Sequence, residues 1–309
     1  MAGEIAIIGA GAMGCLFAAR LAEQGTQVVL VDVDPARIAA INADGVTLTD
    51  DSGTRTIAVR ACRAGDIAVP PALALVFTKS NHTAAAVRSI AHWREGSTLA
   101  LTLQNGLGNA EHLAHAFGED RVLIGTAHIP SDFHPPSRVA THGFARLALG
   151  GMTPAAHRHA QVVGDLLTRA GFEVLVTANI EAQVWEKVAF NAALNATAMV
   201  CGARNADVDC GPGHRIARAI IDETVAVALA KGIAIDGPAV VASVLEALAA
   251  HGHHKPSMLQ DREAGRAGEI ESINGAIVLA AAECGVAVPV CATLADLVRL
   301  VERKELRAS

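Results

Sequence analysis

The fold of the N-terminal half is decided by residues 5–32, which read IAIIGAGAMGCLFAARLAEQGTQVVLVD. Ile5–Ile8 form a short apolar run that stops at Gly9, an amphipathic stretch covers residues 14–24, and Val28–Val31 form a second apolar run. Two short apolar runs on either side of a helical stretch are typical of a strand–helix–strand unit about 30 residues long. The sequence therefore predicts that the chain opens with a βαβ unit.

A glycine pattern occupies the turn between the first predicted strand and the first predicted helix. The pattern GxGxxG appears as Gly9, Gly11 and Gly14, with Ala12 and Met13 before the last glycine. Glycines let the backbone approach a pyrophosphate closely, and the unpaired N–H groups and positive dipole end of the following helix attract its charge. We therefore expect these five residues to bind a dinucleotide.

Asp32 ends the second predicted strand, about 20 residues after the glycine turn. A carboxylate at this place accepts hydrogen bonds from the ribose 2′-OH of NAD but repels the 2′-phosphate of NADP, so Asp32 favours NAD. In the alternative, Asp32 only caps the following turn and Arg37 reaches toward a phosphate, which leaves NADP open. Asp34 as N-cap and Pro35 as first helical residue predict a helix over residues 35–42.

The remaining pattern divides the chain into two domains. Strands are predicted at 72–77, 98–103, 122–124 and 173–176, with helices at 84–92, 109–117 and 154–170 and a β-rich part from 125 to 149. This alternation predicts a doubly wound parallel sheet with right-handed crossovers in a Rossmann-type α/β domain, residues 1–178. Helical periodicity alone follows over 181–201, 214–231, 238–251, 257–265, 270–284 and 292–303. Residues 179–309 are therefore predicted to form an all-α domain.

Length and composition exclude several classes of protein. A chain of 309 residues fits two domains, and a net charge of −6 with 3% aromatic residues gives neither the basic face nor the stacking platform of a nucleic-acid-binding protein. No apolar run of about 18 residues lacks a charge or a breaker, and the N-terminal residues lack the features of a signal peptide. We expect a cytoplasmic protein that binds neither nucleic acid nor membrane.

Neither the cysteines nor the histidines form a recognisable metal site. The cysteines are scattered without a CxxC pair, which predicts small apolar fillers. They are Cys15, Cys62, Cys201, Cys210, Cys284 and Cys291. His251, His253 and His254 cluster in HGHHK, but no carboxylate or cysteine follows at ligand spacing. We predict a solvated interhelical loop at this cluster and no metal.

A polar stripe interrupts the apolar stretch 184–200. Lys187, Asn191 and Asn195 are spaced i, i+4 and i+8, so they project from one face of a helix. Val184, Val188 and small alanines occupy the other face and are expected to bury against the bundle. A buried lysine ammonium has a lowered pKa and acts as a general acid near neutral pH, which suits proton delivery to a developing alkoxide.

Four separated blocks resemble the ketopantoate reductase (2-dehydropantoate 2-reductase) family over nearly the whole chain. They are IIGAGAMG at 7–14, TKSNHT followed by QNGLGN in the first predicted domain, VWEKVAFNAALN at 184–195 and SMLQDREAGRAGEIESINGAI at 257–277. The resemblance implies that Lys79 lies on the cofactor side and that Asn105 lies near the nicotinamide ribose and the substrate. It further implies that Lys187 and Glu269 are the catalytic residues. The residues implied to bind the substrate are Asn105, Asn191, Asn195 and Ser257. Glu269 is expected to hold Lys187 charged and oriented or to bind a substrate hydroxyl.

The resemblance implies hydride transfer between NAD(P)H and a branched 2-keto acid, with ketopantoate giving pantoate in pantothenate biosynthesis, and it is compatible with a homodimer. The family commonly has a basic residue after the second strand, whereas this chain has Val31-Asp32-Val33-Asp34. In this feature it is similar to the branch that contains NAD-dependent D-2-hydroxyacid dehydrogenases, which act on other bulky 2-keto acids and form the alternative. A non-catalytic nucleotide sensor is a further alternative of another class, against which the polar stripe argues.

Overall fold

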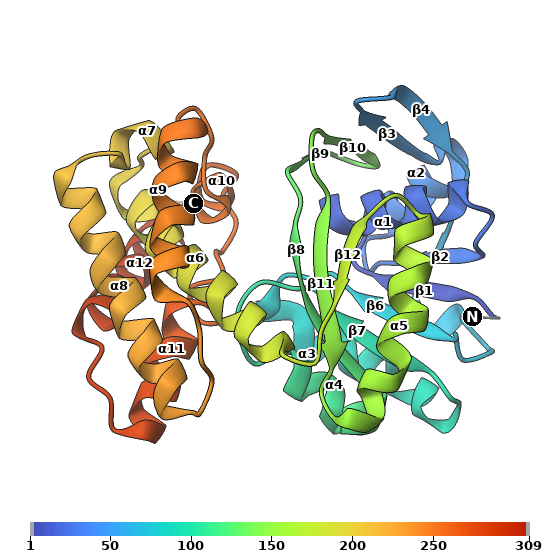
Figure 1. The fold of residues 1–309 in the computed structure, drawn as a ribbon. Coiled ribbons are helices and arrows are strands. Elements are labelled where there is room, and N and C mark those ends of the chain that lie inside the picture. The colour runs from blue at the N-terminus through green and yellow to red at the C-terminus, as the bar shows by residue number, and fades with distance from the viewer. Residues whose placement is uncertain (1–2, 307–309) are drawn as a thin grey trace. The chain divides into compact units, whose positions relative to one another are not determined.

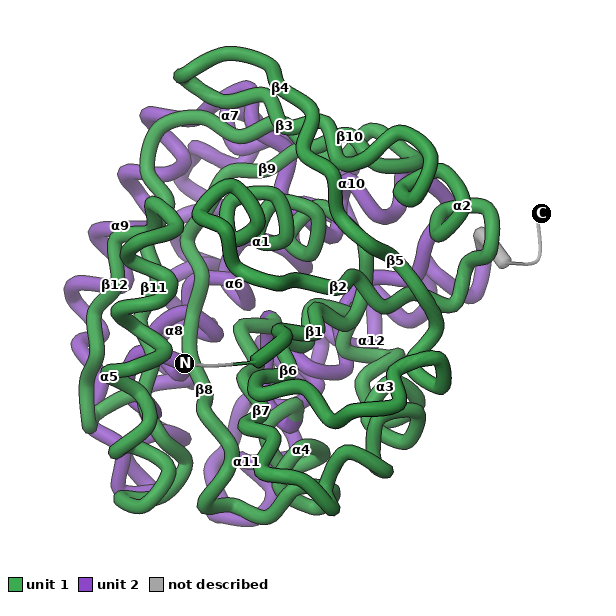
Figure 2. Tube along the Cα trace, turned by 90° about the vertical axis from the view of Figure 1, so that its right-hand side faces the viewer, with its two compact units in different colours: residues 1–104, 109–180 green, residues 105–108, 181–309 purple. Residues whose placement is uncertain are grey.

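The chain folds into two compact units in a computed structural model that describes residues 3–306. Residues 1–104 and 109–180 form the first unit, and residues 105–108 and 181–309 form the second (Figure 2). The first unit combines strands and helices, while the described part of the second is helical (Figure 1). The predicted fold class, an N-terminal Rossmann-type sheet followed by a helical region, is confirmed.

An eight-stranded sheet forms the centre of the first unit. Its strand order is β12-β11-β8-β7-β6-β1-β2-β5. The strands are β1 (Ile5–Ile8), β2 (Val28–Val31), β5 (Arg60–Cys62), β6 (Leu73–Val76), β7 (Leu99–Thr102), β8 (Val122–His128), β11 (Arg146–Gly151) and β12 (Glu173–Val176). Neighbours pair in parallel except β8 and β11, which are antiparallel. This pair corrects the all-parallel expectation, because the chain between its strands forms a hairpin instead of a helical crossover.

Side-chain alternation along the strands gives the sheet two buried faces. Ile5 and Ile7 pack in one core with helices α1 (Ala12–Glu23) and α5 (Pro154–Arg169). Ala6 and Ile8 point to the opposite face, where they share a core with α3 (Thr83–Ile90) and α4 (Asn109–Phe117). Both faces of a parallel sheet are covered in this way, which explains why its strands read as continuous apolar runs.

Helix α2 (Pro35–Asp44) begins at the residue that Asp34 and Pro35 predicted. The Asp34 carboxylate accepts hydrogen bonds from the backbone N–H groups of Ala36 and Arg37, and Pro35 is the first helical residue. Four short 3₁₀ helices complete the first unit. They are η1 (Ala64–Asp66), η2 (Ser80–His82), η3 (Ala91–Glu95) and η4 (Glu119–Arg121).

A second, four-stranded sheet was not predicted from the sequence. It consists of β3 (Val46–Asp50), β4 (Gly53–Ile57), β9 (Ser131–His134) and β10 (Arg138–Thr141), in the order β4-β3-β10-β9. Val46, Leu48 and Val139 point inward and share a core with α1, while the alternate threonines point outward. β9 and β10 lie within the β-rich part predicted at 125–149. The pairing of β3 with β10 joins residues about 90 positions apart, and such long-range pairing leaves no local signal in the sequence.

The second unit is built around α6 (Ile180–Cys201). Its other helices are α7 (Asn205–Val208), α8 (Gly211–Ala230), α9 (Gly237–Ala250), α10 (Ser257–Glu263), α11 (Asn274–Cys284) and α12 (Pro289–Leu306). Val188 and Ala192 of α6 pack in one core with α11 and α12. Ala189 and Ala193 pack in another core with α8 and α9. Because α6 is apolar on two sides, its remaining face carries the polar stripe.

Three expectations for the second unit need correction. The helix predicted from residue 270 begins only at Asn274, because the Glu269 carbonyl accepts hydrogen bonds from the N–H groups of Ser272 and Ile273 and closes a turn there. Helix α7 was not predicted. Cys201 and Cys210 are exposed rather than core fillers, since they lie at the end of α6 and at the N-cap of α8.

In the described part of the chain no helix has the length and apolarity to span a membrane.

We expect Gly14→Ala to destabilise the protein and Gly11→Ala to be tolerated. A Cβ at position 14 would lie 1.9 Å from the Gly9 carbonyl oxygen, whereas a Cβ at position 11 would meet nothing within 4 Å. Overpacking of this kind costs about 1–3 kcal/mol, and an alanine at the Gly11 N-cap costs less than about 1 kcal/mol. Urea unfolding of both variants measures the difference, and equal loss in the two variants would contradict the packing argument.

Candidate active site

The three glycines of the turn between β1 and α1 have different structural reasons. Gly9 has a φ of 101° and a Cβ there would lie 3.0 Å from the Thr78 nitrogen, while Gly14 lets α1 start directly against Gly9. Gly11 is different, because its φ of −85° suits any residue and no protein atom occupies the space beside it. Its open backbone at the N-terminus of a twelve-residue helix without an acidic first turn fits an anion such as a pyrophosphate.

Asp32 ties the end of β2 to this turn. One oxygen of its carboxylate, Oδ2, accepts a hydrogen bond from the Ala10 N–H at 2.8 Å, and the other, Oδ1, accepts from Val33 N–H at 2.8 Å and Asp34 N–H at 3.0 Å. Burial by itself raises the pKa of the Asp32 carboxyl, but these N–H groups and the Arg37 guanidinium bring that pKa below its ordinary value. Asp32 is therefore a fixed negative charge at the edge of the glycine turn.

Arg37 lies beside this charge. Its Nη1 donates to Asp32 Oδ2 at 3.2 Å, and its guanidinium carbon lies 5.7 Å from the centre of the Phe133 ring. The capping role considered as the alternative for Asp32 is therefore observed, since Asp32 accepts bonds from the following turn, and Arg37 is paired with Asp32 itself. Arg37 has 27% of its side chain exposed.

Met13 and Lys79, two further predicted cofactor residues, lie in the turn and next to a residue that flanks it. Met13 accepts a hydrogen bond from Ser131 through its sulfur at 3.6 Å, and Lys79 follows Thr78, whose backbone nitrogen flanks Gly9. Gln104, to which the sequence analysis gave no role, donates to the Thr78 carbonyl oxygen at 2.6 Å. Gln104 thereby holds the loop that carries Lys79, and only its place before Asn105 in the QNG block hinted at it.

In the second unit, α6 presents the polar stripe as the spacing predicted. Lys187 is partly buried, and burial lowers the pKa of its ammonium from the ordinary value to about 8, while the charge of Glu269 acts in the opposite direction. A group with this pKa is mostly protonated at pH 7 and gives up its proton readily. Asn191, one turn further, has a buried Nδ2 with no hydrogen-bond partner among the described residues.

Glu269 and Asn105 complete the surroundings of Lys187. The Glu269 side chain is 5% exposed, and its Oε2 accepts a hydrogen bond from Asn105 Nδ2 at 3.4 Å. The segment 105–108 belongs to the helical unit although its chain neighbours belong to the first. Leu107 N–H donates to the Ser272 carbonyl oxygen at 2.8 Å, and a Cβ at Gly106 would lie 2.3 Å from that oxygen, so only glycine permits the contact.

Asn195 and Ser257 contact each other directly. Asn195 Oδ1 accepts hydrogen bonds from Ser257 Oγ and from the Met258 N–H, both at 3.1 Å. Asn195 is 4% exposed and its Nδ2 donates to the Asn191 carbonyl oxygen. Helix α10 has no side-chain cap of its own, so Asn195 satisfies its first turn from α6 and fixes the position of Ser257.

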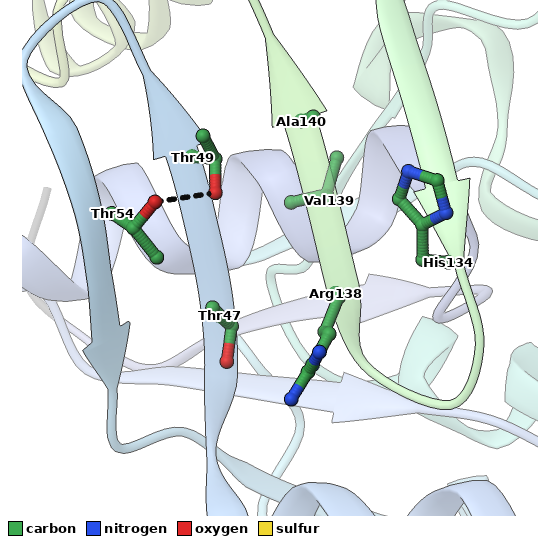
Figure 3. A pocket seen from close by; sticks show the side chains of 7 residues that line it. All are labelled: Thr47, Thr49, Thr54, His134, Arg138, Val139 and Ala140. Atoms are coloured by element: carbon green, nitrogen blue, oxygen red, sulfur yellow. Dashed lines mark hydrogen bonds between the residues drawn. The ribbon is translucent and has the colours of Figure 1, made fainter.

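A hollow on the small sheet contains none of the predicted site residues. It measures about 450 Å³ and lies on the outward face, where Thr47 and Arg138 are register partners, as are Arg138 and His134 (Figure 3). Thr49 and Thr54 share a hydrogen bond of 2.9 Å across this face. Among residues 3–306, no group of three or more His, Cys, Asp or Glu side chains is placed to hold a metal ion.

Comparison with known proteins gives consistent matches along the chain. Residues 5–154 match the family described as "Ketopantoate reductase PanE/ApbA", and residues 179–302 match its C-terminal counterpart. The 2-dehydropantoate 2-reductase of Halobacterium salinarum is 34% identical over 97% of this chain and 99% of its own. The corresponding enzyme of Archaeoglobus fulgidus is 30% identical over 97% of this chain and 98% of its own.

Two solved structures are similar to this chain over nearly its whole length. A D-mandelate dehydrogenase with NADH and anilino(oxo)acetate is 25% identical, with a TM-score of 0.94 over 98% of this chain and 99% of the other. A PanE/ApbA family ketopantoate reductase from Ralstonia eutropha JMP134 is 28% identical, with a TM-score of 0.90 over 98% and 99% of the two chains.

The titration of Lys187 tests the electrostatics of the second unit. We expect its pKa near 8 in the wild type and a lower pKa in Glu269→Gln, because burial then acts without the opposing negative charge. The chain has five lysines, so NMR of lysine ¹³Cε resolves them, and the signal lost in Lys187→Ala assigns the residue. Lys231, paired with Glu283 on the surface, is the internal control. An unchanged or raised Lys187 pKa in Glu269→Gln would contradict the assignment.

Proposed function

This chain belongs to the ketopantoate reductase family, and from this premise we propose that it reduces a branched 2-keto acid with a nicotinamide cofactor, with 2-dehydropantoate giving pantoate. The observation that carries the proposal is the Lys187 ammonium, partly buried on α6 beside the charge of Glu269, with its pKa lowered to about 8. An acid of this strength is suited to protonate an alkoxide at neutral pH.

The glycine turn fits a dinucleotide cofactor. The open space beside Gly11, the helix N-terminus behind it and the carboxylate of Asp32 supply a pyrophosphate site and a ribose site in one loop. A bound nicotinamide supplies the hydride. We assign NAD as the preferred form, because Asp32 stays ionised and opposes a 2′-phosphate, while Arg37 reduces that repulsion in part.

Lys187 donates the proton that the ketone oxygen needs as hydride reaches the carbonyl carbon, and in the reverse direction the neutral amine takes the hydroxyl proton. A positioned acid of this kind contributes about 10²–10⁴-fold to the rate. Glu269 keeps Lys187 protonated against the effect of burial. Asn105 in turn holds the Glu269 carboxylate through a bond to Oε2.

Asn191 and Ser257 are the groups proposed to recognise the substrate. The buried Nδ2 of Asn191 has no partner among the described residues, and a buried donor left unpaired costs about 1–3 kcal/mol. A carboxylate or hydroxyl oxygen of a keto acid satisfies it. Ser257 Oγ is held by Asn195, so its own oxygen is oriented to accept a hydrogen bond. Analogues without these polar groups are rejected because the site atoms stay unpaired.

A second candidate is an NAD-dependent D-2-hydroxyacid dehydrogenase for other bulky 2-keto acids. Two observations favour this candidate. One is the carboxylate of Asp32, and the other is the structural similarity to a D-mandelate dehydrogenase with NADH. The chemistry and the role of Lys187 are the same for both candidates, and only the acyl substituent differs. The homodimer and the cytoplasmic location stay predictions.

We expect Lys187→Ala to lower kcat for keto-acid reduction by about 10²–10⁴-fold, since it removes the proton donor, with cofactor binding retained. Steady-state kinetics and cofactor fluorescence titration measure the two quantities. Lys231→Ala is the matched control, because that lysine forms an exposed ion pair with Glu283 and lies on α8's C-terminal end, outside the polar stripe of α6. A wild-type kcat in Lys187→Ala would remove Lys187 from the mechanism.

We expect kcat/KM to be higher with NADH than with NADPH, and Asp32→Asn to lower the NADH:NADPH ratio by about 10-fold or more, because one charge that opposes the phosphate is lost. The assay uses both cofactors with ketopantoate and with phenyl- and isopropyl-substituted keto acids, so that it also separates the two substrate candidates. Preference of the wild type for NADPH would overturn the assignment of NAD.

A further inference from the structure

Glu269 lies in a part of the second unit that has no helical support. Helix α10 ends at Glu263 and α11 begins at Asn274, so the segment between them contains no regular backbone ladder. The Glu269 carboxylate nevertheless interacts with Lys187, and its charge raises the pKa of that ammonium. A proposed catalytic group must be held to within a fraction of an ångström by surrounding contacts, and those contacts have to come from other elements.

The residue before Glu269 is held by α12. Gly268 N–H donates to Glu302 Oε1 at 2.8 Å. A Cβ at Gly268 would lie 3.2 Å from Met258 Cε and 3.3 Å from that same Glu302 oxygen, so the glycine allows the close approach. Met258 is fully buried and forms the other wall of this contact. The chain is thus fixed to α12 directly before the Glu269 Cα.

The residue two positions after Glu269 is held by the same helix, one turn earlier. Arg299 donates from Nε to Glu271 Oε1 at 2.8 Å and from Nη2 to Glu271 Oε2 at 2.6 Å. This bidentate pair fixes direction as well as distance. Arg299 and Glu302 are spaced i, i+3, so one face of α12 holds both flanks of Glu269.

The two contacts differ from ordinary stabilising pairs. Arg299 and Glu271 have 42% and 68% of their side chains exposed, and exposed ion pairs contribute little to global stability. Ile270 and Ile273 already bury the segment in the core. The contacts with α12 add fixed attachment points on either side of Glu269, while Asn105 donates a hydrogen bond to its carboxylate.

We propose that Arg299 and Glu302 of α12 are positioning residues that hold Glu269 beside Lys187. The proposal rests on the proposed function, because it concerns the same proton donor. Neither residue touches the reacting atoms. Loss of either contact lets the segment 268–271 move, and the interaction between Glu269 and Lys187 weakens as the distance between them grows.

The variants are chosen to separate positioning from folding. Glu302→Ala removes the acceptor for Gly268 N–H, whereas Glu302→Gln keeps an oxygen that accepts the same bond. Arg299→Met removes the bidentate pair and keeps the alkyl stem, which provides a second test if Glu302→Ala does not fold. Asp296→Ala is the matched control, since it removes the other partner of Arg299, at 2.9 Å, and leaves the bond to Glu271.

The primary measurement is the Lys187 pKa by lysine ¹³Cε NMR in the full chain, together with kcat, the KM for cofactor and the melting temperature. We expect Glu302→Ala and Arg299→Met to lower the Lys187 pKa toward its value in Glu269→Gln and to reduce kcat by up to about 10-fold, with the KM for cofactor unchanged. Glu302→Gln and Asp296→Ala are expected to keep the wild-type pKa and kcat.

The outcomes distinguish the positioning role of Arg299 and Glu302 from the proposed function. If Glu269→Gln shifts the Lys187 pKa while Glu302→Ala and Arg299→Met leave it at the wild-type value, the positioning role is wrong and the proposed function stands. If Lys187→Ala retains full turnover, the proposed function itself fails. A fall in melting temperature without any change in the Lys187 pKa assigns the α12 contacts to stability alone and overturns the proposal.

Discussion

The chemistry proposed for this chain depends on one electrostatic balance, between the burial of the Lys187 amine and the negative charge of Glu269. Burial alone favours a neutral amine, which has no proton to donate. An opposing carboxylate that is itself largely buried keeps the ammonium form without pairing it so strongly that the proton is trapped. The remaining features of the helical unit serve to hold these two groups.

Helix α6 shows how packing produces that arrangement. It is apolar on two sides because it separates two cores, and the small side chains of Ala189 and Ala192 let neighbouring helices approach closely. The face left over carries Lys187 and Asn191. Asn195 is nearly buried. Its side chain accepts hydrogen bonds from the first turn of α10 and from Ser257, and it thereby orients Ser257.

The glycine turn in the first unit illustrates a different division of roles. Gly9 and Gly14 are glycines because the protein's own backbone requires it, through a positive φ in one case and a close helix–turn contact in the other. Gly11 has no such internal reason, and the space beside it is open. Gly11 thus leaves backbone N–H groups at the start of α1 open to an external group. Asp32 links the turn to the sheet, so the shape of the loop and its charge are set together.

The sequence by itself determined the elements that follow from local physics. The apolar runs at Ile5–Ile8 and Val28–Val31, the cap at Asp34 and the i, i+4, i+8 stripe on α6 each depend on neighbours within about ten residues, and all appear in the structure. Only the tertiary structure decided the antiparallel pairing of β8 with β11 and the pairing of β3 with β10 that joins the four-stranded sheet. It also decided that Asn105 belongs with the helical unit and that α12 holds the flanks of Glu269. These features join residues tens of positions apart, and the free energy that selects them comes from contacts that no local window of sequence contains.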